Sequence, residues 1–437
     1  MKHLFLGILF FVLASVAKAE PDGDWWKPRA MSGSRLILVA SARQTAIETK
    51  IPLPNQEMAF ADRRSGNPRL NGHIPGATSL RHRRSRTTSA NRDRYREFCE
   101  SGVAVPIFCK PWWLDAVCGT DNWDVALVDK DGHLLGSMPY YSTKLLGQNL
   151  ITMPKFTTRM GPFITHLSNQ KYAGLLHHDQ TIMNELIDQI PDSMHFHQDF
   201  DYRITDGLPF HWRNFTLNVR YTYVIENLSN LNDVWLGFQQ NARRHVRNSS
   251  KVVTVRSDLG IDRLMELSEL TQRRQNLNPI YTRDRLHALH SACSMNDAGR
   301  LFFAEDDKGR LHAGLYLVWD ENAAYYLIGG GDPCLRNSGA TSLLMWKAIE
   351  FAATVTKSFD FNGSMKESIQ QFFRSFGAKQ KSYLSVSKTN HLMKVLLEYR
   401  KKYLSLNRSW RNSLLAGRLK VLPFALSILT SYSPVLA

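Results

Sequence analysis

The feature that most constrains the fold is a succession of alternating elements in residues 323–377. Residues 323–328 (AAYYLI) are an apolar, aromatic-rich run that predicts a strand, and residues 329–333 (GGGDP) are expected to break it. A helix is then expected from residue 336, followed by a second short strand at residues 358–361. The turn before the helix leaves backbone N–H groups unpaired at the helix N-terminus, which suits phosphate binding.

The turn itself has a pattern that resembles a known family. Arg336 adds a fixed positive charge beside the helix N-terminus. The spacing Arg336-x-x-Gly339-x-Thr341 is similar to the pyrophosphate loop of the GNAT acetyltransferase fold, which reads Arg/Gln-x-x-Gly-x-Gly/Ala. Thr341 departs from the small residue of the last position.

Three further segments make the resemblance more specific. The sequences DFNGS at residues 360–364 and FFRSFG at residues 372–377 look like the end of the FemAB-like acetyltransferases, the group that includes cellulose-biosynthesis-associated members. The sequence PWWLDAV at residues 111–117 resembles the start of that group. The resemblance covers roughly residues 95–404.

The resemblance implies an α/β fold with an α+β mixed sheet, made of two GNAT-like lobes in tandem. The predicted hairpins at residues 126–140 and 303–316 echo each other and agree with this repetition. The expected segments are a signal-peptide-like start (1–19), a disordered basic extension (20–93), an N-terminal GNAT-like lobe (94–229), a C-terminal GNAT acyltransferase lobe (230–404) and a basic, apolar tail (405–437).

Two local patterns predict helices in the C-terminal half. Residues 232–248 have apolar side chains on one side and are expected to form a single amphipathic helix. Ser364-x-x-Glu367 fits a capping box at the start of the last helix of the 323–377 unit.

The resemblance implies an N-acyltransferase that takes an acyl group, acetyl in the simplest case, from acyl-CoA. The acceptor would be an amine of a small molecule, an amino sugar or an envelope or polysaccharide precursor, acylated by direct transfer. A backbone N–H in residues 325–330 would polarise the thioester carbonyl. The expected cofactor-binding residues are Ile328, Arg336, Asn337, Ser338, Gly339, Ala340 and Thr341.

Three side chains are candidates for the chemistry. Asp360 ends the second predicted strand, where it is either an acceptor-binding carboxylate or base, or a ligand of the neighbouring backbone. Tyr325 and Tyr326 alternate faces, so one of them, taken here as Tyr326, points into the cleft unless it packs in the core. Glu305, on the preceding hairpin, is either a base within reach or a surface residue.

Two other functions stay open on the same residues. The first is a FemAB-type peptidyltransferase, which would take an aminoacyl group from tRNA. The second is a binding or scaffold protein whose transferase site has decayed. Apart from the first alternative, no specific nucleic acid is expected as a partner, because no nucleic-acid-binding motif is present.

Charge and cysteine content add little to this picture. The formal net charge is +16, and residues 1–92 hold fifteen Lys and Arg against six Asp and Glu. The excess elsewhere fits a solvated surface or attraction to anions such as CoA phosphates. The five cysteines, His177-His178 and His195-x-His197 lack metal-site spacing, so no metal is expected.

The two ends of the chain bear on where it works. Lys2, the apolar residues 4–16 and Ala17-Lys18-Ala19 are typical of a signal peptide. Acyl-CoA, however, is a cytoplasmic co-substrate, and unpaired cysteines are uncommon in exported proteins. We therefore expect the globular part, from about Arg94, to work in the cytoplasm. Residues 421–437 are apolar but short for a span, and at most weak contact with a membrane surface is expected of them.

Overall fold

A computed structural model describes residues 80–397, apart from residues 146, 167–170, 276, 278–280 and 396. The signal-peptide-like start, the extension up to residue 79 and the tail from residue 405 lie outside the described residues. The end of the extension lies inside them, and α2 (Leu80–Glu100) is helical over residues 80–93, which we expected to be disordered. Tyr95 holds this helix in place, because its buried ring lies 6.4 Å from that of Trp123.

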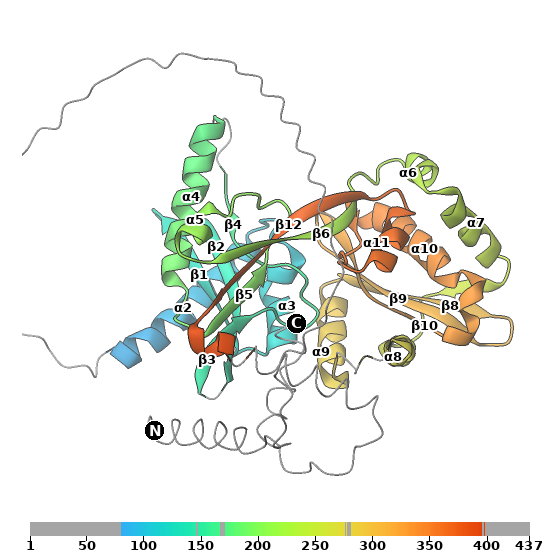
Figure 1. Cartoon of the computed structure of the whole chain (residues 1–437), viewed down its shortest axis with the longest axis horizontal. Coiled ribbons are helices and arrows are strands. Elements are labelled where there is room, and N and C mark those ends of the chain that lie inside the picture. Colours follow the sequence, from blue (N-terminus) through green and yellow to red (C-terminus); the bar gives the residue numbers. More distant parts are fainter. Residues whose placement is uncertain are drawn as a thin grey trace, which may run out of the picture. The chain divides into compact units, whose positions relative to one another are not determined.

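The described residues form a mixed α/β fold (Figure 1). The strands are β1 (Trp123–Lys130), β2 (His133–Leu145), β3 (Gln148–Thr152), β4 (Phe163–Ile164), β5 (His195–Asp199), β6 (Thr216–Ile225), β7 (Val253–Arg256), β8 (Gly299–Asp306), β9 (Leu311–Trp319), β10 (Ala323–Gly331), β11 (Ser358–Asp360) and β12 (Lys379–Thr389). The helices after α2 are η1 (Ile107–Cys109), α3 (Pro111–Cys118), α4 (Tyr172–Gln189), α5 (Leu208–Trp212), α6 (Leu231–Gly237), α7 (Gln240–Ser249), α8 (Ile261–Arg274), α9 (Arg283–Met295), η2 (Pro333–Ser338), α10 (Ala340–Val355) and α11 (Glu367–Arg374).

One mixed sheet contains all the strands of the described residues. Its order is β1-β2-β3-β5-β12-β6-β11-β10-β9-β8-β7, and β4 pairs with β2. The pairs are antiparallel except for β3 with β5 and β10 with β11. The α/β mixed sheet and both expected hairpins, β1–β2 and β8–β9, are therefore confirmed.

Two strands tie the halves of the sheet together. β12 lies at the C-terminal end of the described chain, yet it pairs with β5 on one side and β6 on the other. β6 pairs in turn with β11 through Val224 and Ile225. β12 belongs to the second predicted lobe, yet it lies between two strands of the first. The sheet of the first lobe is therefore incomplete without the second.

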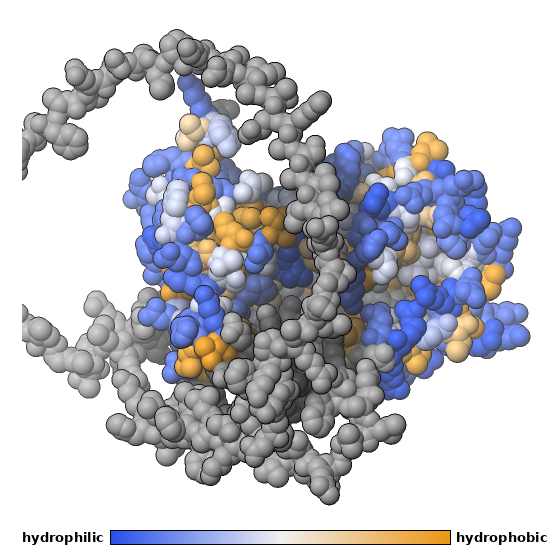
Figure 2. All heavy atoms as spheres, viewed as in Figure 1, coloured by the Kyte–Doolittle hydropathy of each residue, from blue (hydrophilic) through white to orange (hydrophobic). Residues whose placement is uncertain are grey.

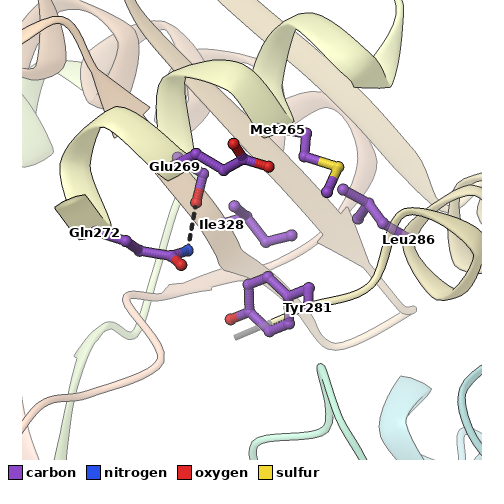
Figure 3. A pocket seen from close by; sticks show the side chains of 7 residues that line it. Met265, Glu269, Gln272, Tyr281, Leu286 and Ile328 are labelled. Carbon is purple, nitrogen blue, oxygen red and sulfur yellow. Dashed lines mark hydrogen bonds between the residues drawn. The ribbon is translucent and has the colours of Figure 1, made fainter. Parts of the chain in front are cut away.

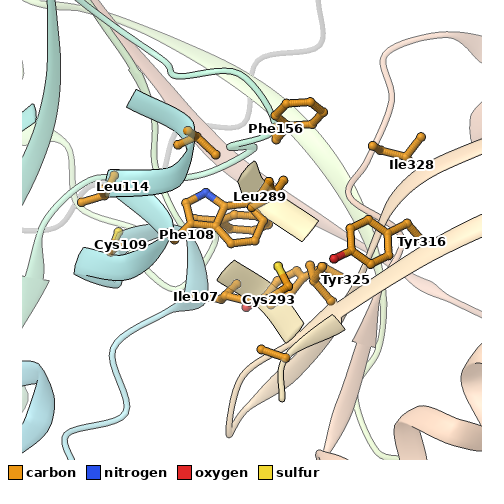
Figure 4. Close-up of a cluster of buried hydrophobic side chains, with 14 of the residues drawn as sticks. Ile107, Phe108, Cys109, Leu114, Phe156, Leu289, Cys293, Tyr316, Tyr325 and Ile328 are labelled. Atoms are coloured by element: carbon orange, nitrogen blue, oxygen red, sulfur yellow. The ribbon is translucent and has the colours of Figure 1, made fainter. Parts of the chain in front are cut away.

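Helices cover both faces of the sheet around β8 to β10. On one face α7, α10 and α11 pack around a cluster that includes Phe238, Phe361 and Phe376. On the other face α8 and α9 pack together with α3 of the N-terminal half. Figure 4 shows Leu289 and Cys293 of α9 in the same cluster as Leu114 of α3. There the Phe108 ring lies 5.1 Å from Trp113 and 4.9 Å from Tyr325. The two halves therefore share an apolar cluster.

Both expected helical segments form, but the continuity of the first and the capping box of the second were predicted wrongly. Residues 232–248 form two helices, α6 and α7, because the chain is extended at Phe238 and Gln239. The break turns Phe238 into the core, where its ring lies 5.0 Å from that of Phe376. No capping box forms either, since α11 begins after Lys366 and the Ser364 Oγ accepts only from the Lys366 N–H, at 3.1 Å.

The glycine run expected to break the strand is instead part of β10, which extends to Gly331. α8 lies directly on this end of the strand, and the Gly331 N–H donates to the Thr271 hydroxyl at 3.0 Å. A Cβ on Gly330 would lie 2.4 Å from the backbone of Leu267 and of Ser268. The lack of a side chain therefore allows the helix and strand backbones to touch.

Gly330→Ala is expected to destabilise the protein by about 2–3 kcal/mol, because α8 must shift to admit the methyl group. The matched control is Gly174→Ala in α4, where a Cβ would meet open space. That change should be neutral or stabilise by roughly 0.5 kcal/mol through helix propensity. Urea unfolding of both variants measures the two effects. Equal stability of the two variants would show that α8 does not rest on this glycine.

The large exposed apolar side chains of the described residues include Leu208 and Trp212 on α5 and Val219 and Tyr221 on β6. Large exposed apolar residues such as Met295, Tyr172 and Leu236 belong to different helices, α9, α4 and α6. The visible face around α6 and α7 is mainly hydrophilic (Figure 2). Within the described residues, no helix is long and apolar enough to cross a membrane.

Candidate functional site

The parallel strands β10 and β11 stop pairing partway along β10. Pairing runs from Ala323 with Ser358 to Tyr325 with Asp360, where β11 ends. β10 continues beyond this point with β9 on its other edge. The register between β10 and β9 shifts at Leu327, which forms a β-bulge and bends the strand. On the side that β11 leaves, no strand of the described residues therefore pairs with β10 after Tyr325.

The turn after β10 brings most of the predicted phosphate-binding residues to one helix N-terminus. η2 leads into Gly339, whose φ of 74° lets the chain turn into α10. The predicted residues Arg336, Asn337, Ser338, Gly339, Ala340 and Thr341 all lie in this turn, while Ile328 lies on β10. Arg336 and Thr341 are exposed beside the start of α10. The Ala340 N–H donates to Ser338 Oγ at 3.3 Å and the Ser342 N–H to the Gly339 carbonyl at 2.9 Å, so among the first N–H groups of the helix that of Thr341 has no partner within the described residues.

Asp360 is fully buried, and both of its carboxylate oxygens are engaged. Oδ1 accepts from the Thr222 hydroxyl at 2.6 Å and from the Asn362 N–H at 2.8 Å. Oδ2 accepts from Arg159 Nη2 at 2.5 Å. Burial raises the pKa of Asp360, while the charge of Arg159 acts in the opposite direction. The carboxylate therefore holds protein groups in place and has no free oxygen facing solvent.

Arg159 was not predicted, and it comes from the N-terminal half of the chain. It lies in the loop between β3 and β4, which we call the 153–162 loop. Its guanidinium carbon lies 5.7–6.0 Å from the ring centres of Tyr202, Tyr325 and Tyr383. Its side chain is only 2% exposed, and Nε and Nη1 have no hydrogen-bond partner among the described residues. The Arg159–Asp360 pair thus joins the two halves beside the end of β11.

Asn362 extends this connection to β10. Its Nδ2 donates to the Tyr326 carbonyl at 3.0 Å, just where β10 and β11 have parted. Its Oδ1 accepts from Thr158 Oγ1 at 2.9 Å and from Arg159 Nη2 at 3.2 Å. The 153–162 loop therefore fixes the geometry of both strand ends.

Tyr326 lies beside the open edge of β10. Its ring packs edge-on against Phe373 at 6.1 Å, and its hydroxyl covers Gly329, where a Cβ would be 1.8 Å from Oη. Burial raises the pKa of Tyr326 to about 12, so the hydroxyl keeps its proton at neutral pH. Tyr325 points to the opposite face, where its hydroxyl donates to Asp320 at 3.1 Å.

A small pocket lies on that opposite face, between α8 and β10 (Figure 3). Its walls include Met265 and Glu269 of α8, Tyr281 and Leu286, and Ile328 of β10. The Tyr281 ring stacks on Phe156 of the 153–162 loop at 4.2 Å. The same loop that fixes the strand ends therefore also forms the surroundings of this pocket.

Glu305 is not brought together with Asp360 or Tyr326. It lies on β8, where its Oε2 accepts from Arg256 Nη1 of the neighbouring strand β7 at 2.5 Å. Two strands, β9 and β10, separate β8 from β11. Of the three predicted catalytic residues, the structure gathers only Asp360 and Tyr326 at the end of β11. Among the described residues, no group of three or more His, Cys, Asp or Glu side chains could hold a metal ion.

Comparison with known proteins agrees with this architecture. Residues 237–367 match the model of a family described as an acetyltransferase (GNAT) domain. The sequence matched no protein of curated function. Among solved structures, the fold is similar to that of FemX, with a TM-score of 0.51 and 14% identity over 67% of this chain and 95% of FemX.

Two other structures align at lower TM-scores. The C-terminal domain of a putative lysylphosphatidylglycerol synthetase from Agrobacterium fabrum has a TM-score of 0.43 and 10% identity, over 71% of this chain and 96% of its own. A tandem GNAT protein from the clavulanic acid biosynthesis pathway has a TM-score of 0.39 and 10% identity, over 70% and 95%. Residues 237–367 therefore resemble an acetyltransferase (GNAT) domain in sequence, and the described part of the chain has a fold similar to that of FemX.

Proposed function

We propose that the protein is an N-acyltransferase that transfers an acyl group, acetyl in the simplest case, from acyl-CoA to an amine. The observation that carries the proposal is the end of β10–β11 pairing at Tyr325 and Asp360, next to the bulge at Leu327. This leaves backbone groups of β10 available to an extended ligand. The N-terminus of α10 follows β10 through η2 and Gly339. A ligand that lies along β10 could therefore place a phosphate group at this helix N-terminus.

The residues present suit acyl-CoA. Its pyrophosphate would lie against the first turn of α10, with Arg336 supplying charge and Thr341 at the second helical position. Its thioester would reach the residues after Leu327, so a backbone N–H of β10 near Ile328 would polarise the carbonyl. The acyl chain would then end near Tyr326 and Asn362, at the parted strands.

The reaction we propose is direct. The acceptor ammonium first loses a proton, its nitrogen then forms a bond to the thioester carbonyl carbon, and the carbon–sulfur bond breaks. The leaving thiolate takes a proton, and the nitrogen loses a second proton, which replaces the one given to the thiolate. One proton therefore passes to solvent overall. Tyr326, which keeps its hydroxyl proton at neutral pH, is the proposed donor to the thiolate. Asp360 is proposed to position Asn362 and the strand ends, because its oxygens are already engaged.

The proposed cofactor also indicates in which compartment the protein works and which acceptors it could acylate. An enzyme that uses acyl-CoA works where acyl-CoA is made, so we propose a cytoplasmic site of action. The acceptor class proposed from sequence, a small molecule, an amino sugar or an envelope precursor, shares one requirement, a free amine. The family match lies in the half of the chain that holds β10 and α10.

Titration calorimetry of the full-length protein with acetyl-CoA tests the proposal. We expect micromolar binding, followed by acetylation of at least one amine in a mass-spectrometric screen. Steeply salt-dependent binding of aminoacyl-tRNA without CoA binding would favour the peptidyltransferase alternative. CoA binding without turnover of any amine would favour a binding protein with a decayed site. No affinity for acetyl-CoA overturns the proposal.

A further inference from the structure

The pocket between α8 and β10 has one charged group among apolar walls. Met265, Tyr281, Leu286 and Ile328 contribute apolar surface, and Glu269 contributes a carboxylate (Figure 3). The remaining lining residues, Ser268 and Gln272, are hydrogen-bonded to each other at 3.1 Å. The space measures about 270 Å³ including its open mouth, and the enclosed end admits about one water-sized group. An ammonium group has that size.

Glu269 is free to exchange its present partner. Its ion pair with Arg273, one turn along α8, spans 3.2 Å between side chains that are 30% and 73% exposed. Such exposed pairs contribute little free energy. A ligand ammonium in a partly dry pocket would form a stronger, charge-assisted bond with the same carboxylate.

The pocket lies against the strand that is proposed to hold the thioester. Ile328 contributes its side chain to the pocket and follows directly after the bulge at Leu327. Tyr281 lies in the pocket wall opposite the helix, and its ring stacks on Phe156 at 4.2 Å. A ligand in the pocket would therefore contact the side chain of Ile328, the residue whose backbone N–H is proposed to lie near the thioester carbonyl.

We infer that this pocket binds the acceptor, that Glu269 holds its ammonium group, and that the acceptor is a primary amine with an apolar chain beside the nitrogen. The role of the pocket as acceptor site rests on the proposed acyl transfer, whereas the binding of an amine by Glu269 does not. A polar chain such as that of an amino sugar would leave its hydroxyl groups unpaired against Met265, Leu286 and Ile328, at a cost in binding free energy.

Binding of a small probe to the full-length protein tests the inference directly. Butylamine is titrated into the protein with and without CoA, and chemical-shift changes of the ligand are followed by NMR. Two probes of similar shape are matched controls: 1-butanol lacks the charge, and 2-methoxyethylamine replaces a chain methylene by oxygen. We expect butylamine to bind about tenfold more tightly than either probe.

Substitution of the carboxylate locates the binding. Glu269→Gln should weaken butylamine at least tenfold and leave acetyl-CoA affinity unchanged. The control is Glu266→Gln on the same helix, whose side chain is 54% exposed and pairs with Arg263 outside the pocket. It should change neither affinity.

The outcomes separate the two proposals. If the wild-type protein does not bind acetyl-CoA, the proposed function is overturned. Butylamine binding that is weakened by Glu269→Gln would still support an amine site in the pocket. Acetyl-CoA binding with butylamine affinity unchanged in Glu269→Gln overturns the pocket alone. Absence of butylamine binding, or tighter binding of 2-methoxyethylamine, overturns it as well.

Discussion

Thr341→Asp is expected to lower the affinity for acetyl-CoA at least 100-fold, about 3 kcal/mol, while the fold stays intact. Thr341 is exposed and occupies the second position of α10, after Gly339 and Ala340. A carboxylate there stands beside the proposed pyrophosphate, and repulsion between like charges opposes binding. The same carboxylate stabilises the helix N-terminus by roughly 0.3–1 kcal/mol, so stability should rise or stay unchanged.

Thr341→Asn is the matched control, because asparagine has the shape of aspartate without its charge. It should keep acetyl-CoA affinity within about threefold of the wild type. Calorimetry gives the affinities, and thermal unfolding gives the stabilities. Equal affinities of the Asp and Asn variants would place the pyrophosphate away from α10.

Gly339→Glu would also place a negative charge in this turn, but it is a poorer test. Gly339 has a φ of 74°, which strains any residue with a side chain. A Cβ there would also lie 3.3 Å from His245 of α7. Loss of CoA binding in that variant would not separate a blocked site from a displaced helix. Thr341 avoids both problems because it is exposed and helical.

The succession of hydrophobic and turn residues along the sequence predicted the main strands and the main helix of residues 323–361. The strand at residues 323–328, the helix expected from residue 336 and the strand at residues 358–361 follow from hydrophobic period and turn residues within one short stretch. The helix itself begins later than predicted, at Ala340, after the 3-10 turn of η2. These elements appear as β10, α10 and β11. The residues of the phosphate turn are neighbours in the chain, so their spatial proximity needed no tertiary information.

The elements that sequence reasoning missed depend on contacts between distant residues. Gly329 to Gly331 read as a turn, but α8 packs on them and keeps them in the strand. Residues 232–248 read as one helix, but burial of Phe238 against Phe376 divides it. Hydrophobic period carries no information about which helix will lie on which strand, so tertiary packing overrides local preference here.

The candidate site was predicted only on its C-terminal side. For Asp360 the sequence left two roles open, an acceptor-binding carboxylate or base and a structural ligand. Its hydrogen bonds with Arg159, Thr222 and Asn362 favour the structural role. Arg159 is 201 positions away along the chain, in a loop without helix or strand period. Nothing in the sequence near Arg159 or Thr158 distinguishes them from surface loop residues. Pairing of buried charges between the two halves is visible only in the structure.

Arg159→Met is expected to lower the free energy of unfolding by about 3–5 kcal/mol. Both partners of the pair are almost fully buried, at 2% and 1% exposure, and the Arg159–Asp360 contact is 2.5 Å long. Methionine fills similar space without the charge, so the main loss is the uncompensated carboxylate rather than a cavity. Asn362 also loses its bond from Nη2, which weakens the link to β10.

The control is the double variant Arg159→Met with Asp360→Asn, in which neither charge remains. Asparagine Oδ1 can still accept from Thr222 and from the Asn362 N–H, as the carboxylate does. Replacing both partners of a buried pair is often close to neutral, so the double variant should recover about 2–3 kcal/mol of the loss. Urea unfolding of the wild type, both single variants and the double variant completes the cycle.

The pH dependence of Arg159→Met separates a buried charge from lost packing. Burial raises the pKa of Asp360, and removing Arg159 removes an interaction that lowers it. The folded state of the variant therefore binds a proton more readily than the unfolded state, so its stability falls as pH rises. We expect the difference in stability from the wild type to shrink as pH is lowered from about 7 to about 5. A difference that is constant over this range, together with no recovery in the double variant, would mean that Arg159 acts through its packing against Tyr202, Tyr325 and Tyr383 instead.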